Sequence, residues 1–411
     1  MTTLVRPFRG LRPTPEAAAN VAAPPYDVLN SAEAKAKAQG KPHSFLHISK
    51  PEIDLPDGTD VYSPAVYQKG ADNFNALIKS GVLVRDDAPS YYVYRMRMGA
   101  HTQTGLAFVA SVADYDTNRI RKHEFTRPDK EDDRVRQIEA LNAQTGPVLL
   151  AYRKHAEVQN ILMEAARAEP LYEVKGEYGV IHSVWRIDDP AAVERITTAF
   201  DAMDALYIAD GHHRSAAASR VSAKKKTESA SYFLAVAFPH DQMRILDYNR
   251  VIKDLNGLSI DDFLKKIRTK FIVTTHGQQY APLSPTHFGM YLKGPDQKGQ
   301  WYELVIQPDL VPAKDPVGQL DVSLLQNNLI APILGIADPR RDKRIDFVGG
   351  IRGLTELEER VNSGDMAVAF ALHATRMDQL MAVADAGEVM PPKSTWFEPK
   401  LADGLVSHVL D

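Results

Sequence analysis

The sequence predicts a mixed α/β protein of the α+β kind, in which helices pack on mixed sheets in two domains. The chain has 411 residues and 44% of them are hydrophobic, which is enough to bury a large core and more than one typical domain needs. Runs with the two-residue period of strands and runs with the helical period of 3.6 residues occur in both halves.

The chain up to about Ser49 is rich in proline and alanine. Its segment Ala22–Val28 contains paired prolines, which force an extended, turn-like backbone. We therefore expect an ordered N-terminal arm.

The rest of the first half alternates between strand and helix patterns, each run being bounded by turn residues. The expected strands are Ser90–Met98, Leu106–Tyr115, Val148–Tyr152, Ser183–Ile187 and Ser231–Phe238. The expected helices are Ser63–Ser80, Asp129–Ala143, Ala156–Ala168 and Pro190–Met203.

The second half repeats this mixture, which indicates another α/β domain. Strands are expected near Phe271–Thr275, Met290–Lys293 and Trp301–Ile306, and helices near Ser259–Lys270, Val322–Leu334 and Leu354–Ser363. We divide the chain into domains 1–253 and 254–411, with Gly277–Pro285 as a competing linker, and we allow the last segment to return to the site of the first domain.

Composition excludes several function classes. A net charge of −4 gives no global positive field, which disfavours nucleic acid and anionic membranes as partners. The absence of cysteine excludes disulfides, thiolate nucleophiles and cysteine-based metal sites. No apolar run is long enough for a signal core or a membrane span, so we expect a cytoplasmic protein.

The most informative stretch is Ala205–Ala218, where a short apolar strand meets a polar turn and then a helix of small residues. The first turn of such a helix offers unpaired N–H groups and the positive end of the helix dipole. Arg214 adds a guanidinium, and Asp210, Gly211, His212 and His213 complete the cluster. We interpret it as a phosphate-binding site, with Asp210 as a candidate metal ligand.

A purely structural interpretation of this turn is also open. Asp210 and Gly211 would then form a tight turn, and Asp210 or Ser215 would cap the helix. Because adjacent histidines cannot face the same way, only one of His212 and His213 is expected to meet a substrate.

A second cluster follows the strand that contains Ile120. Glu124 is placed to deprotonate a hydroxyl or to bind a substrate ammonium group, with Lys122, His123 and Thr126 nearby. In the alternative, Glu124 is a surface residue and the acidic residues after it only begin a helix.

A third segment, Gly387–Leu401, almost matches a nucleotide P-loop, but Pro392 stands where the glycine before Lys393 should be. With Pro391 it removes two N–H donors from the loop, so this is not a Walker loop. Lys393 and Ser394 remain candidates to reach a phosphate site, and a rigid packed turn is the alternative.

Four separated motifs resemble the bacterial and archaeal "domain of unknown function 1015" family, nearly from end to end. They are Ala23-Pro-Pro-Tyr-Asp-Val, His123-Glu-x-Thr, Ala209-Asp-Gly-His-His-Arg and Met390-Pro-Pro-Lys-Ser-Thr-Trp-Phe-x-Pro-Lys-Leu. Because the function of this family is not known, function has to be argued from the site.

The turn Asp210–Arg214 also resembles the signature turn of the ParB/sulfiredoxin superfamily, which implies a ParB/sulfiredoxin-like core in the N-terminal half. Sulfiredoxins have a catalytic cysteine where this chain has His212, so sulfinic acid reduction is excluded. ParB clamps have Gly-Glu-Arg-Arg there and basic helices that read DNA, which this acidic chain does not match.

The free serine kinases of this superfamily remain, and the resemblance implies a nucleotide-dependent kinase that uses ATP or ADP with Mg²⁺ and acts on free L-serine. Glu124 would be the base, with His123, His212 and His213 in catalytic roles. Phosphates would be bound by Lys122, Thr126, Asp210, Gly211, His212, His213, Arg214, Lys393 and Ser394. The alternatives are a regulatory switch that binds CTP or ATP without turnover, and a ParB-like DNA-binding module.

Overall fold

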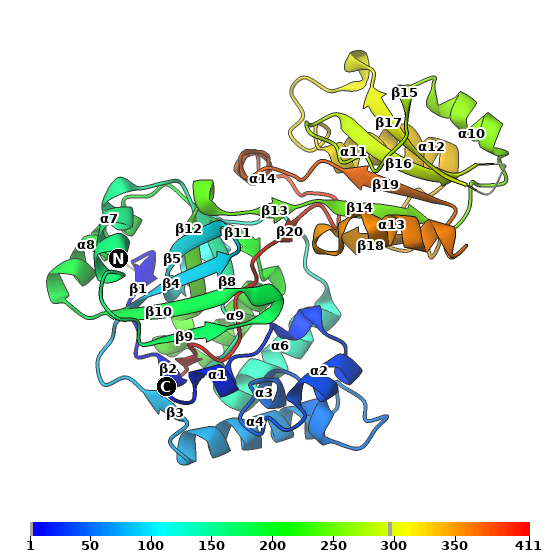
Figure 1. Ribbon diagram of the computed structural model, residues 1–411. Helices are drawn as coiled ribbons and strands as arrows, with labels where there is room; N and C mark the ends of the chain where they lie inside the picture. The colour runs from blue at the N-terminus through cyan, green and yellow to red at the C-terminus, as the bar shows by residue number, and fades with distance from the viewer. Residues whose placement is uncertain (1–2, 295–297) are drawn as a thin grey trace. The chain divides into compact units, whose positions relative to one another are not determined.

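The computed structural model describes residues 3–294 and 298–411 and separates into two compact units. Unit 1 comprises Met1–Met243 together with Pro399–Asp411, and unit 2 comprises Arg244–Glu398. The units change over at Met243 and Arg244, ten residues before the division at 253 and 254, and the last segment returns to unit 1, where it pairs with β7. Helices and sheets are mixed in both units, which confirms the α/β class (Figure 1).

Unit 1 is built on one mixed sheet with the strand order β6-β11-β8-β12-β5-β4-β10-β9, and β1 pairs with β5. The strands are β1 (Val5–Arg6), β4 (Tyr91–Met98), β5 (His101–Ser111), β6 (Ile120–Arg121), β8 (Val148–Tyr152), β9 (Tyr172–Lys175), β10 (Ile181–Ile187), β11 (Leu206–Asp210) and β12 (Tyr232–Pro239). The pairs β6–β11 and β8–β12 are parallel, and the other neighbours are antiparallel.

Six helices of the described part of unit 1 pack on this sheet or on one another. They are α4 (Pro64–Lys79), α5 (Val112–Asp116), α6 (Pro128–Leu141), α7 (Ala156–Ala165), α8 (Pro190–Asp201) and α9 (His212–Lys225). Helix α9 contacts β8 and β12, α6 packs between α4 and α9, and α7 packs against α8. The helix that begins the candidate site, α9, is therefore held against the middle of the sheet.

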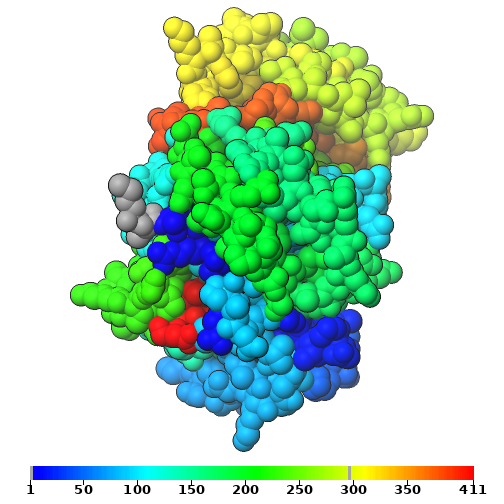
Figure 2. Space-filling model, turned by 90° about the vertical axis from the view of Figure 1, so that its left-hand side faces the viewer, coloured from blue at the N-terminus to red at the C-terminus, as the bar shows by residue number. Residues whose placement is uncertain are grey.

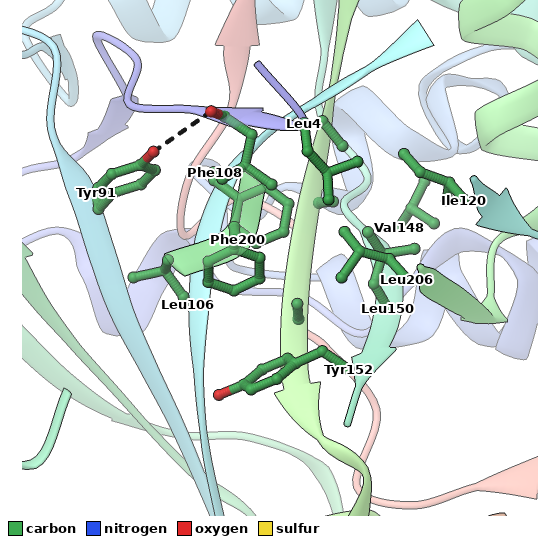
Figure 3. Close-up of a cluster of buried hydrophobic side chains, with 14 of the residues drawn as sticks. Leu4, Tyr91, Leu106, Phe108, Ile120, Val148, Leu150, Tyr152, Phe200 and Leu206 are labelled. Atoms are coloured by element: carbon green, nitrogen blue, oxygen red, sulfur yellow. Dashed lines mark hydrogen bonds between the residues drawn. The ribbon is translucent and has the colours of Figure 1, made fainter. Parts of the chain in front are cut away.

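The main core of unit 1 lies between the sheet and these helices (Figure 3). Leu4, Phe108, Leu150 and Phe200 are fully buried in it. Tyr91 is also buried, and its hydroxyl donates a hydrogen bond of 3.5 Å to the carbonyl oxygen of Val5. Burial of this much apolar surface is the main stabilising contribution to a fold of this size.

Two expectations for the first half need correction. The N-terminal arm is ordered, as expected, but it also contains helices that were not expected: α1 (Ala18–Val21), α2 (Ser31–Ala38) and α3 (Leu46–Ser49), which pack with α4 around a second apolar cluster. The strand expected to reach Tyr115 ends at Ser111, because the Ser111 side chain accepts a hydrogen bond of 3.1 Å from the Asp114 N–H and caps α5.

Unit 2 has its own antiparallel sheet, with the order β15-β17-β16-β19-β14-β18. The strands are β14 (Tyr248–Ile252), β15 (Phe271–His276), β16 (His287–Lys293), β17 (Gly299–Ile306), β18 (Ile345–Gly349) and β19 (Val368–Leu372). The helices are α10 (Ile260–Ile267), α11 (Asp321–Leu325), α12 (Ala331–Leu334), α13 (Gly353–Asn362) and α14 (Met377–Asp385). The single helix expected over 322–334 is interrupted, since α11 and α12 are joined by a π-helical turn over 326–330.

Short strand pairs complete both units. They are β2 (Leu11–Pro13) with β3 (Leu83–Arg85), β7 (Ala143–Gln144) with β21 (His408–Val409), and β13 (Ile245–Leu246) with β20 (Trp396–Phe397).

The C-terminal segment packs into unit 1, where most of Leu401–Leu410 is buried and Asp411 at its end is exposed. Figure 2 shows part of this segment in red, beside N-terminal residues in blue and residues in green. The Ser229 hydroxyl donates a hydrogen bond of 2.7 Å to the carbonyl oxygen of Asp411, and the guanidinium of Arg85 pairs with the Asp411 side chain. Among the described residues, no helix combines the length and the apolar character needed to cross a bilayer.

Candidate active site

The candidate site lies where two parallel strands of unit 1 end. Strands β6 and β11 are neighbours at one edge of the sheet, with Ile120 opposite Leu206 and Arg121 opposite Tyr207. Because the strands are parallel, the loop after β6 and the turn after β11 emerge at the same end of the sheet, which is where ligands bind in many α/β proteins. This brings Glu124 and the Asp210–Arg214 turn together.

The turn between β11 and α9 depends on Gly211. Its φ is +100°, a left-handed conformation that side chains with a Cβ rarely adopt. A Cβ at this position would lie 3.1 Å from Nε of Arg214 and 3.4 Å from Cα of Val148. No side chain caps α9, so the suggested caps by Asp210 and Ser215 are wrong.

The two adjacent histidines point in different directions, as the spacing predicts. His212 is buried, and its ring lies edge to face with that of His123 at a centroid distance of 4.5 Å. His213 is half-buried, and its Nε2 accepts a hydrogen bond of 3.0 Å from the Arg127 N–H. Only His212 therefore faces the His123 and Glu124 side of the site.

Glu124 reaches this inner histidine. Its Oε2 lies 3.7 Å from Nδ1 of His212, and 48% of its side chain is exposed. His123, by contrast, is buried. A half-exposed carboxylate beside the first turn of a helix is accessible to a substrate and close to a potential phosphate site.

The histidines of the site are neutral at neutral pH. Burial lowers the pKa of His123 to about 4, and burial together with the nearby His123 ring lowers the pKa of His212 well below its usual range. Burial also lowers the pKa of His213. These rings offer lone pairs and N–H groups, and positive charge has to come from other residues.

Lys400 supplies a positive charge next to Asp210. Its Nζ donates a hydrogen bond of 3.1 Å to Oδ2 of Asp210, and 22% of the lysine and 30% of the aspartate side chain are exposed. Partial burial favours the neutral acid, but Lys400 and Arg214 outweigh it and hold the pKa of Asp210 far below its usual range. Asp210 is therefore a permanent carboxylate that solvent reaches, which fits a single ligand to Mg²⁺.

Arg214 is largely committed to the protein itself. Its guanidinium donates to the carbonyl oxygen of Pro147 and lies 3.6 Å from Asp27 and 3.8 Å from Asp210. Burial opposes the charge, yet Asp27 and Asp210 outweigh it and raise the pKa of Arg214. With only 10% of its side chain exposed, Arg214 mainly orients the turn and its two carboxylates.

Beneath the turn lies a cavity of about 30 Å³, lined in part by Tyr26, Arg134, Arg214 and Asp403. Burial raises the pKa of Asp403 to about 7, although Arg214 partly opposes the shift. A cavity of this volume has room for roughly one water molecule. The cavity is therefore too small for a nucleotide. Glu124 is half-exposed and Asp210 and Lys400 are partly exposed.

Two further candidates of the β6 loop have local partners. The Lys122 ammonium donates a hydrogen bond of 2.8 Å to the carbonyl oxygen of Tyr115 and lies 3.9 Å from the centre of the Tyr115 ring. The Thr126 hydroxyl donates to Glu131 in α6. Both side chains hold the loop to neighbouring helices.

Lys393 and Ser394 belong to unit 2 and form the packed turn that was the alternative to a phosphate loop. The Ser394 side chain is buried, and its hydroxyl donates a hydrogen bond of 2.6 Å to the carbonyl oxygen of Pro391. Lys393 has a φ of +59°, and its carbonyl oxygen accepts a hydrogen bond of 3.0 Å from Arg250.

Sequence reasoning missed two charged residues of the site, Lys400 and Asp27. Both lie inside motifs that were noted, Lys400 in the segment after Met390 and Asp27 in the Pro-Pro-Tyr-Asp segment. The available signal is a charged residue close to a rigid proline, since Lys400 follows Pro399 directly and Asp27 is two residues after Pro25.

Comparisons with known proteins give a family and several remote structural likenesses. The family described as "Protein of unknown function (DUF1015)" matches residues 5–323. No curated protein matches the chain.

Similar solved structures include a conserved hypothetical protein from Pyrococcus furiosus, with a TM-score of 0.35, 14% identity, and coverage of 73% of this chain and 94% of that chain. Another is SbnI with a C-terminal truncation from Staphylococcus aureus, with a TM-score of 0.39, 14% identity and coverage of 73% and 86%. A third is a free serine kinase in complex with AMP, with a TM-score of 0.34, 12% identity and coverage of 71% and 86%.

The family match runs from residue 5 through the N-terminal arm, the β6 loop and the β11–α9 turn into unit 2. It therefore includes the segments that bring Glu124, Asp210 and His212 together, and the chain belongs to the DUF1015 family.

Proposed function

We propose that this protein is a kinase that transfers a phosphoryl group from ATP or ADP to the hydroxyl of a small molecule, with free L-serine as the substrate. The observation that carries the proposal is the position of Glu124. Its side chain is half-exposed, and its Oε2 lies 3.7 Å from Nδ1 of His212 in the first turn of α9. A base and a phosphate-binding helix terminus thus adjoin one open surface, as phosphoryl transfer requires.

In the proposed reaction, Glu124 accepts the proton of the substrate hydroxyl. The hydroxyl oxygen forms a bond to the terminal phosphorus, while the bond from that phosphorus to the bridging oxygen breaks and its electron pair leaves with the nucleotide. The Lys400 ammonium and the N-terminal amides of α9 stabilise the negative charge on the phosphate oxygens. Arg214 keeps Asp210 in position from below.

Mg²⁺, when bound by Asp210 and the phosphates, supplies further charge neutralisation and fixes the phosphate geometry. Asp210 suits this role because it stays ionised and is partly exposed. The neutral histidines do not suit this role, because Mg²⁺ prefers oxygen ligands.

The direct test is to incubate the protein with ATP or ADP, Mg²⁺ and L-serine and to measure O-phosphoserine by mass spectrometry. We expect product with wild-type protein and a loss of about 100-fold or more with Glu124→Gln, which cannot accept the proton. The control Glu169→Gln changes an exposed loop residue and should keep full activity. The absence of O-phosphoserine with both ATP and ADP would refute the proposed kinase activity.

Lys400→Met tests the phosphate site separately. The substitution removes the ammonium next to Asp210 and should weaken nucleotide binding by about tenfold, as read by calorimetry. Unchanged affinity would exclude Lys400 from phosphate binding. Tight nucleotide binding by a wild-type protein that forms no product would instead favour the regulatory switch.

A further inference from the structure

His123, His212 and Glu124 form a cluster whose chemistry phosphate binding does not use. One ligand atom from each residue lies within 4.8 Å of the corresponding atoms of the other two. The two histidines are buried, and Glu124 is exposed at the opening of the cluster. Two imidazoles and one carboxylate supply three ligands, which leaves at least one further coordination position on a metal ion open.

The ring of His123 has a buried lone pair without a partner. Nδ1 of His123 has no hydrogen-bond partner among the described residues, although His123 is only 2% exposed. The ring also makes a hydrogen bond with the backbone of Ile208. A neutral imidazole carries its hydrogen on one ring nitrogen, so with the hydrogen on Nε2 the lone pair of Nδ1 is available to a ligand.

An imidazole held by a backbone carbonyl on one nitrogen is typical of metal-binding histidines. An unpartnered buried nitrogen also costs free energy, which binding of a cation would recover.

We propose that His123, His212 and Glu124 bind a divalent first-row transition-metal ion, such as Zn²⁺ or Mn²⁺, at the carboxyl ends of β6 and β11. Imidazole nitrogen distinguishes this site from a Mg²⁺ site, and Asp210 is not one of its ligands. The inference does not depend on the kinase reaction.

Metal binding requires small adjustments within the cluster. Ligand atoms on one tetrahedral ion lie about 3.3 Å apart, so the 3.7 Å between Glu124 and His212 nearly fits already. The backbone N–H of His123 donates to Nε2 of His212 at 3.4 Å. When His212 coordinates a metal ion through Nδ1, its ring proton lies on Nε2. The long hydrogen bond from the His123 N–H to Nε2 of His212 is then lost.

Glu124 has two carboxylate oxygens, so it can be a metal ligand through one and accept a proton through the other. The two roles are separable by experiment. If Glu124 is a ligand, its removal weakens metal binding in the absence of nucleotide and serine, whereas a base alone would leave metal binding unchanged.

The test uses full-length protein that has been stripped of metal by a chelator and titrated with Co²⁺, without nucleotide or serine. We expect a saturable visible absorption band at one Co²⁺ per chain, and displacement of Co²⁺ by Zn²⁺. Glu124→Ala should lower the affinity by about tenfold or more, as should His212→Gln. Because Glu124 is half-exposed, its variant is expected to remain folded.

The matched controls are Glu169→Ala for an exposed glutamate and His182→Gln for a buried histidine outside the cluster. Both should keep the wild-type Co²⁺ band. The absence of a saturable band at millimolar Co²⁺, or an unchanged affinity in folded Glu124→Ala and His212→Gln, would overturn the proposal. If the protein binds Co²⁺ as described but makes no O-phosphoserine, the proposed kinase activity is refuted and the proposed metal site stands.

Discussion

Gly211 is the residue on which the geometry of the turn depends most. Gly211→Ala places a Cβ 3.1 Å from Nε of Arg214, at a φ of +100°. The matched control Gly58→Ala has a φ of +86° and nothing within 4 Å, so it carries only the backbone cost of about 1–2 kcal/mol. We expect Gly211→Ala to lose more unfolding free energy than the control in urea titrations. An equal or smaller loss would mean that the turn adapts without moving Arg214.

His182 makes the stability of unit 1 depend on pH. Burial lowers its pKa from 6.5 to about 4, so its contribution to stability is complete above pH 6.5 and is lost as the pH falls towards 4. At pH 4 the loss is roughly 3 kcal/mol. The stability difference between wild-type protein and His182→Gln, followed by thermal unfolding, should therefore shrink from pH 7 to pH 4. A constant difference would contradict the lowered pKa.

For single residues, the sequence shows which residue types follow one another but not which distant residues they contact in the fold. The grouping of Asp210, His212 and Arg214 was predictable, because a strand, a glycine and a helix follow in sequence. The pairing of Arg214 with Asp27 was not predictable, since Asp27 lies far away in the chain. The pairing of Lys400 with Asp210 escaped prediction for the same reason.

At the scale of elements, the segment after Pro399 stabilises the helices that carry the site. Leu410 is fully buried and packs with Ile138 of α6 and with Ala217 and Val221 of α9. Leu410→Ala should lower the unfolding free energy of unit 1 by about 2–5 kcal/mol. The control Leu283→Ala, at a side chain that is 88% exposed, should change it by less than about 0.5 kcal/mol.

Calorimetry is the measurement for this comparison, because each unit has its own apolar cluster and unfolding need not be two-state. Leu410→Ala should shift the transition of unit 1 alone. An equal shift by both substitutions would show that the last segment does not support α6 and α9.

Long amphipathic elements were predictable and short ones were not. Helices α4 and α6 were expected within two residues of their observed bounds, because an apolar face repeats over several turns. Helices α1 and α3 have four residues each, too few to show that period. Helix α14 was also missed. Strands β18 and β19 were missed as well, and most of their neighbours in the sheet lie far away in the sequence.

At the scale of the whole molecule, the mixed α/β class follows from the alternating sequence patterns. Which segments belong to which unit does not follow from them. Pairing of β21 with β7 joins residues near 408 to residues near 144. Such a return depends on long-range strand pairing, which leaves no local signal. The expected division at residues 253 and 254 relied on local turn signals only.

The central claim is that the carboxyl ends of β6 and β11 form one site for a nucleotide phosphate and a hydroxyl substrate. The most direct test is a crystal structure of the protein with ADP, Mg²⁺ and L-serine. We predict phosphate oxygens within hydrogen-bonding distance of the α9 N-terminal amides and Lys400, and the serine hydroxyl beside Glu124. Nucleotide bound elsewhere, with Glu124 and the α9 turn untouched, would contradict the claim.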